Sequence, residues 1–251
     1  MLCTLRHAIA TFMLIGLSAC QHAVTPPSTS DTHKILVPKP STKLTVNPAR
    51  SYVLAIAYPA GAFAKLGHHH TIRWPIKQGT LWVTSKIIGS VADLAIPVAE
   101  ARVDLPHDRQ QASLEGPMPS EADRLGTRHN LLGPDQLDAS TFPTIRVRAE
   151  VSAHHQKRCY QAQVTVTVKG HPSHHLWPVC DQSMDKQLVL KGCMDVSQTS
   201  LGLVPFSRLG GLLRVADVIR LCFHLEATAH SAEVSPSVIA SSNESLTSSS
   251  I

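Results

Sequence analysis

Residues 144–151 read Thr-Ile-Arg-Val-Arg-Ala-Glu-Val, so apolar side chains alternate with polar or charged ones along the whole stretch. Successive side chains of a β-strand point to opposite faces of a sheet, so this period of two predicts a strand with one apolar and one wet face. Residues 161–168, Gln-Ala-Gln-Val-Thr-Val-Thr-Val, repeat the pattern, and residues 218–227 show it again. Strands with one apolar and one polar face are typical of antiparallel sheets.

Working outward from these stretches, the sequence predicts eight strands with short links and no alternation of strand and helix. The long insertion, residues 106–142, contains a helical stretch near 120–132. We therefore expect an all-β fold, either an eight-stranded antiparallel up-and-down barrel or a sandwich. The expected strands are 51–58, 70–84, 87–104, 144–153, 159–169, 174–181, 187–198 and 213–228.

A barrel of about eight strands encloses a lumen just wide enough for side chains or for one slender ligand. In up-and-down order the longest links, including 59–69, 106–142 and 199–212, fall at one end, which we expect to be the mouth. Burial of an apolar ligand in such a lumen is favourable by roughly 25 cal/mol per Å². The alternative is that the inward side chains pack against one another and leave no cavity. Alternation predicts these inward side chains: Ile145, Val147, Val151, Val164, Val166, Val168, Ile219, Leu221, Phe223 and Leu225.

The two ends of the 251-residue chain differ from the part between them. An apolar run at 8–17 leads into Leu-Ser-Ala-Cys at 17–20, which resembles a bacterial lipobox. We expect a signal peptide at 1–19, a lipid on Cys20 and a Pro/Ser/Thr-rich tether at 20–48. An ordinary signal peptide is the alternative. The barrel domain is expected at 49–229 and a disordered Ser-rich tail at 230–251.

The expected location is the periplasm, with the lipid anchor in a membrane. Gln21, rather than Asp, follows Cys20, and by resemblance to enterobacterial sorting this favours the inner leaflet of the outer membrane. The net charge of +5 comes without a dense run of Lys and Arg, so we expect no nucleic-acid partner. The sequence has no nucleophile-elbow, zinc-protease or phosphate-loop motif, so we expect no enzyme and no cofactor.

Four of the six cysteines remain if Cys3 leaves with the signal peptide and Cys20 carries a lipid, and an even number in an oxidising compartment suggests disulfides. Three pairings are open, and four free thiols are the alternative. Hairpin register favours the pairs Cys159–Cys180 and Cys193–Cys222, because the second pair lies outward at opposed positions of adjacent strands.

The chain has 15 histidines, and two groups of them are expected at the mouth. His68 and His70 share one face if they lie on a strand, and His171, His174 and His175 follow at the same end. Convergence of these five side chains would make a metal-binding module, which is the alternative function. Otherwise His68 or His70 donates a hydrogen bond to a ligand headgroup such as a quinone carbonyl, and the remaining histidines are polar turn residues.

Four segments, taken in order, resemble the YceI family of periplasmic polyisoprenoid- and lipid-binding proteins. The segments are Ser51-Tyr52-Val53 with Gly67-His68 and Gly79, then His129–Leu132 with Leu137–Ile145, then Val166–His171, and last Gln198–Ser207. The resemblance covers nearly all of 49–229 and implies a lipocalin-like barrel. It implies a non-catalytic carrier or storage protein for an isoprenoid lipid or quinone, with His68, His70, Phe142 and Phe206 joining the lumen residues as the ligand site.

Overall fold

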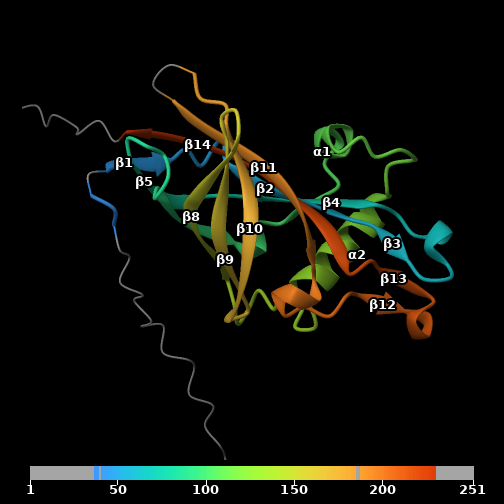
Figure 1. The fold of residues 1–251 in the computed structure, drawn as a ribbon. Coiled ribbons are helices and arrows are strands. Elements are labelled where there is room, and N and C mark those ends of the chain that lie inside the picture. The colour runs from blue at the N-terminus through green and yellow to red at the C-terminus, as the bar shows by residue number, and fades with distance from the viewer. Residues whose placement is uncertain (1–36, 40, 185–186, 230–251) are drawn as a thin grey trace, which may run out of the picture. The chain divides into compact units, whose positions relative to one another are not determined.

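The computed structural model describes residues 37–39, 41–184 and 187–229 (Figure 1). The expected signal peptide, the lipid attachment at Cys20 and the Ser-rich tail lie outside the described residues. Among those described, no helix is long and apolar enough to cross a membrane. The strands that form the wall of a barrel are β1 (Thr42–Val46), β5 (Gln78–Val83), β6 (Val91–Pro97), β8 (Thr144–Gln156), β9 (Cys159–Val168), β10 (His171–Asp181), β11 (Leu188–Ser197) and β14 (Val218–Ala229).

These strands pair in the order β1-β5-β6-β8-β9-β10-β11-β14, and β1 returns to β14 through the pair Leu44 and Ala229. Every pairing is antiparallel, so the sheet is a closed eight-stranded barrel. The expected all-β, lipocalin-like barrel is confirmed.

Three barrel strands are bent, and each continues beyond its bend toward the mouth. β2 (Tyr52–Ala57) prolongs β1, β4 (His70–Pro75) precedes β5, and β7 (Arg102–Val103) follows β6. At the mouth end β14 therefore pairs with β2 rather than with β1, and β2 in turn pairs with β4. Because of these bends, each of the three segments contributes one strand to the barrel wall and another strand nearer the mouth.

The structure places the first wall strand, β1, inside residues 20–48, which the sequence assigned to the tether. The barrel therefore begins at Thr42 and not at 49, as we had expected. Leu44 and Val46 supply a short apolar alternation, but two such residues after a proline-rich segment give a weak signal. β1 owes its place to pairing on both sides, with β5 and with β14.

A small second sheet lies beside the mouth. Residues 213–215, expected to begin the last strand, form β13 (Leu213–Val215), which pairs with β12 (Ser207–Arg208) and β3 (Pro59–Ala60). Figure 1 shows this sheet and α2 (Glu121–Leu132) together at one end of the barrel. Short 3-10 turns complete this end and the bends, at Ala64–Leu66, Val98–Glu100, Thr199–Leu201 and Leu209–Gly211.

The insertion contains the helix α2 where the sequence predicted it. Ser120 and Asp123 form a reciprocal capping box, which satisfies free amide groups of the first turn. Arg128 donates hydrogen bonds to the carbonyls of Ala99 (2.6 Å) and Ala101 (3.0 Å), which fix the helix across the mouth. A second, short helix, α1 (Pro106–Gln111), contacts β4 on the outside of the barrel.

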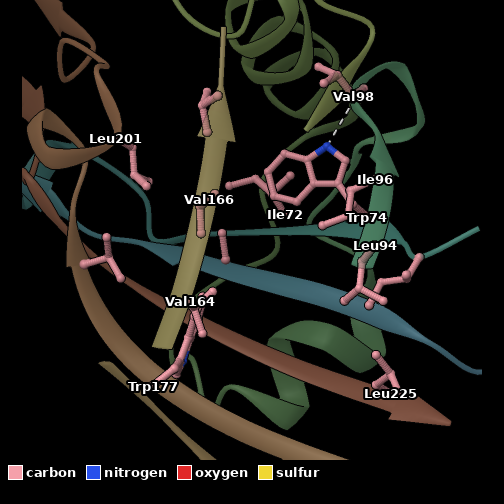
Figure 2. Packing of buried hydrophobic residues seen from close by; sticks show 14 of the residues in the cluster. Ile72, Trp74, Leu94, Ile96, Val98, Val164, Val166, Trp177, Leu201 and Leu225 are labelled. Atoms are coloured by element: carbon pink, nitrogen blue, oxygen red, sulfur yellow. Dashed lines mark hydrogen bonds between the residues drawn. The ribbon is translucent and has the colours of Figure 1, made fainter. Parts of the chain in front are cut away.

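The interior of the barrel is apolar. Figure 2 shows the Trp74 indole beside Ile72 and Ile96, with its Nε1 donating to the Val98 carbonyl at 3.2 Å. Val164 and Val166 project inward from one strand, as their alternation predicted. The single polar atom of this tryptophan is therefore satisfied while its ring adds apolar surface to the wall.

The two expected disulfides, Cys159–Cys180 and Cys193–Cys222, are present. In each pair the two residues are directly opposed in the antiparallel register. Cys193 is exposed, so its bridge lies on the outer face of the barrel, away from the lumen.

Candidate functional site

The barrel is hollow, with two cavities of about 120 Å³ and about 240 Å³. A dry apolar cavity of roughly 150 Å³ accepts benzene; the larger space exceeds this volume and the smaller one is somewhat below it. The smaller one, the lower chamber, lies at the end opposite the mouth and includes Leu81, Val151 and Leu225 in its lining. The larger one, the upper chamber, lies under α2 and the loop at 201–206.

The two chambers adjoin one another, because they share four lining residues. This waist consists of Val53, Ile96, Val147 and Trp177. Trp177 packs edge-on against Phe223, with the ring centroids 6.2 Å apart. A slender apolar chain that passed the waist would touch both chambers at once.

Polar lining residues gather at the mouth. The upper chamber is lined by His70, Thr127, Asn130, Gln136 and Gln198 among apolar side chains. Two of these donate to main-chain carbonyls across the mouth: Gln136 to Val204 at 2.9 Å and Gln198 to Ala216 at 2.8 Å. Apolar walls with a few fixed polar groups at one end are typical of sites that bind lipid-like molecules.

The residues expected to form the ligand site lie mostly on this lumen. Ten inward side chains of β8, β9 and β14, together with His70 and Phe206, line one chamber or both. His68 and Phe142 do not line either chamber, because His68 is exposed before β4 begins and Phe142 packs beside Gly170 in a turn. The role of these side chains in binding stays a prediction.

A buried carboxylate fixes the orientation of the His70 ring. Asp104 is fully buried, and its Oδ2 lies 2.7 Å from His70 Nδ1. Its Oδ1 accepts hydrogen bonds from the Thr71 amide at 2.9 Å and from Arg109 at 3.2 Å. Burial acts to raise the pKa of Asp104, but the bonds from His70, Thr71 and Arg109 outweigh it and hold that pKa below the usual aspartate value.

This geometry decides what a neutral His70 can offer to a ligand. Because the Asp104 carboxylate accepts at Nδ1, the proton of the neutral ring lies on Nδ1, and Nε2 is left as a hydrogen-bond acceptor. We had expected a neutral imidazole that donates to a carbonyl. In this tautomer the neutral ring can accept a hydrogen bond at Nε2, for example from a hydroxyl, but cannot donate one there.

The five mouth histidines do not converge. Among the residues described, no group of three or more His, Cys, Asp or Glu side chains is arranged to hold a metal ion. The rings of His68 and His70 lie 6.3 Å apart, while His174 Nδ1 is 3.1 Å from Thr165 Oγ1 on the outside of β10. His171 packs against Gly202. The geometry therefore does not support the alternative of a metal-binding module at the mouth.

His175 has a different environment from the other mouth histidines. Its Nε2 lies 3.0 Å from Ser173 Oγ. Burial, and secondarily the charge of His174, lower the pKa of His175. Both effects favour the neutral ring, which fits a polar wall residue better than a charged ligand-binding group.

Sequence reasoning missed several lining residues and the residue that orients His70. Trp74, Leu81, Leu94 and Trp177 line the lumen, and alternation within 70–84 and 87–97 could have identified the first three. Asp104 gave no such signal, since it follows the strand at a backbone φ of 50° and its partners His70 and Thr71 are 34 and 33 residues away in the sequence.

Comparisons with known proteins identify the fold. No family model and no curated protein matches the sequence. The crystal structure of Burkholderia cenocepacia BcnA aligns with a TM-score of 0.52 and 17% identity, over 73% of this chain and 99% of that one. The Campylobacter jejuni YceI protein aligns with a TM-score of 0.41 and 12% identity, over 55% of this chain and 71% of that one. A mutant CJ YceI protein with a monobromobimane guest aligns with a TM-score of 0.45 and 12% identity, over 61% and 82%. The alignment with BcnA shows that the chain shares the fold of that protein.

Proposed function

We propose that the lumen binds one elongated apolar lipid of the isoprenoid class, with a hydroxyl headgroup at His70, in a non-catalytic carrier or storage role. The observation that carries this proposal is an interior of two adjoining chambers, apolar along its length and polar at the mouth. Anchoring of the protein to a membrane of the envelope through Cys20 is part of the proposal and rests on the sequence alone.

An apolar tail fits the apolar lining of the two chambers, and a polar headgroup fits the polar lining residues at the mouth. A hydrocarbon tail in water loses roughly 25 cal/mol for each Å² that it exposes, and the lumen removes this cost without polar groups along the tail. A prenol or a hydroquinone can donate a hydrogen bond from its hydroxyl group to His70 Nε2. A quinone carbonyl cannot be bound in this way by the neutral ring, so the reduced form of a quinone fits better than the oxidised form.

Obstruction of the waist should abolish ligand retention. Val147→Phe adds a ring where the two chambers meet, and we expect at least about tenfold less co-purifying lipid, since the tail loses contact with one chamber. The measurement is organic extraction of the purified full chain followed by mass spectrometry. Val218→Phe, on an exposed residue of β14, is the matched control and should retain the wild-type amount. Equal retention by both variants, with both folded by circular dichroism, would contradict the proposal.

Loss of the acceptor at the mouth should weaken binding of an alcohol selectively. We expect His70→Leu to reduce the affinity for farnesol about fivefold, because one hydrogen bond is worth about 1 kcal/mol. Affinity for farnesyl methyl ether, which has no hydroxyl proton, should be unchanged. Both affinities can be measured by quenching of tryptophan fluorescence, since Trp74 and Trp177 line the lumen. His68→Leu is the control, and an equal loss for both probes would show that His70 only shapes the wall.

A further inference from the structure

The loops around the small sheet carry an exposed apolar cluster that the ligand site does not use. We define the mouth tip as Phe63, Leu66, Leu209 and Leu212. Leu66 is 73% and Leu209 is 66% exposed, which is unusual for leucines that occupy neighbouring turns.

Specific contacts hold the two loops of the mouth tip together. The Phe63 amide donates to the Leu212 carbonyl at 2.8 Å, and β3 pairs with β13 just beyond it. Gly61 has a φ of +89°, and a Cβ there would lie 2.5 Å from the Leu212 carbonyl oxygen, so only glycine permits this close approach. The four apolar side chains are therefore presented from one joined structure rather than from independent loops.

Leu209 carries an additional local cost. Its φ is 52°, a left-handed conformation that a leucine rarely adopts. An exposed leucine in a conformation suited to glycine or asparagine breaks two local preferences at once. Such violations cluster at sites that contact a ligand or surface.

The two segments that carry the mouth tip are basic, and Asp217 directly follows the second of them. Residues 58–69 and 199–216 contain Lys65, Arg208 and Arg214 and no Asp or Glu. All three basic residues are exposed. Asp135 shares a groove with Arg208, outside these two segments. Apolar tips beside basic side chains match a bilayer surface that contains anionic lipids, which attracts nearby Lys and Arg.

The mouth tip is also continuous with the lumen. Arg208 lies 5.1 Å from the Phe206 ring centroid, and Phe206 and Val215 line the upper chamber. A surface on which the tip rested would therefore face the polar end of the lumen.

We propose that the mouth tip docks the barrel onto an anionic lipid membrane, with its four apolar side chains in the headgroup region and Lys65, Arg208 and Arg214 on the lipid phosphates. This contact is separate from the expected lipid on Cys20. It places the mouth, and not the opposite end of the barrel, at the bilayer. It does not depend on whether the lumen is filled.

The test is hydrogen–deuterium exchange of the full chain with and without vesicles, which reads the tip directly and independently of any anchor. Vesicles of an equal mixture of phosphatidylglycerol and phosphatidylcholine should slow exchange in 61–66 and 207–214, and pure phosphatidylcholine should do so much less. Added salt should reverse part of the effect, since it screens the basic side chains. Protection of other segments only, or of none, would overturn the proposal.

Two sets of variants distinguish vesicle binding through the mouth tip from nonspecific binding through other exposed apolar side chains. Leu66→Ser with Leu209→Ser should weaken vesicle binding about tenfold, through loss of two apolar insertions. Ile88→Ser with Leu176→Ser, on apolar residues that are exposed away from the mouth tip, should leave it unchanged. Light scattering of the wild-type chain and of both double variants, without vesicles, then measures the oligomeric state. A stable dimer that the first pair abolishes and the second preserves would show that the tip binds a second copy, and would refute membrane docking.

Discussion

Asp104→Asn is expected to lower the free energy of unfolding by about 3 kcal/mol, because it leaves the buried Arg109 guanidinium without its counter-charge. Asparagine is the informative replacement. It is similar in size and tolerates the left-handed backbone at this position, and it removes the charge while replacing one of the two acceptor oxygens by an NH2 donor. Urea denaturation followed by circular dichroism measures the change.

The matched control is another aspartate in an ion pair. Asp195 binds Arg220 with both oxygens on the outside of the barrel, where about half of each side chain is exposed. Asp195→Asn should cost less than about 1 kcal/mol, since water screens the pair. Equal costs for the two variants would show that the Asp104 charge is not needed for the fold.

The dependence on pH provides an independent reading of the same change. The pKa of Asp104 is lower in the folded chain than its ordinary value, so its contribution is complete above about pH 4 and disappears as the pH falls through the folded pKa. The difference in stability between wild type and Asp104→Asn should therefore shrink in acid. A difference that stayed constant from neutral pH down to about pH 2 would exclude this linkage.

Removal of either disulfide is expected to cost about 3 to 4 kcal/mol in the chain-entropy account. The bridges close segments with sequence separations of 21 and 29, which restricts the unfolded chain by similar amounts. The double variants Cys159→Ser with Cys180→Ser and Cys193→Ser with Cys222→Ser can be compared in urea. A reducing agent should destabilise wild type and should have no effect on the chain that lacks all four cysteines.

Ligand retention should respond differently from stability to this change. The Cys193–Cys222 bridge lies on the outer face, so its loss removes no lining atom. Under conditions where the variant is folded, it should extract with the wild-type amount of lipid. Loss of lipid from a folded variant would mean that the bridge shapes the lumen.

Most of the barrel could be predicted from the alternation of apolar and polar residues along its strands. Positions such as Val147, Val164 and Leu225 could be assigned to the inside because each has a polar neighbour on both sides in the sequence. The same alternation placed Cys193 and Cys222 outward and opposed, which was enough to pair them. These features are local, and a strand's face follows directly from them.

The functional detail at the mouth depends on contacts between distant segments, which no local pattern encodes. The sequence identified His70 as a candidate ligand-binding residue, but the tautomer of its ring depends on Asp104, which is 34 residues away. β1 and the small sheet were missed for a related reason. Each contains only two to five residues, and its pairing partners decide its conformation.

The ladder between β10 and β11 contains only the pairs Cys180 with Lys191 and Asp181 with Leu190, and Pro178 has no amide hydrogen with which to extend it. One disulfide joins β10 to β9 and the other joins β11 to β14, so the covalent staples lie on either side of this ladder and none crosses it. We therefore expect the thermal opening of the barrel wall to be greatest between β10 and β11. A ligand too wide for the mouth would then enter between these two strands, with both disulfides intact.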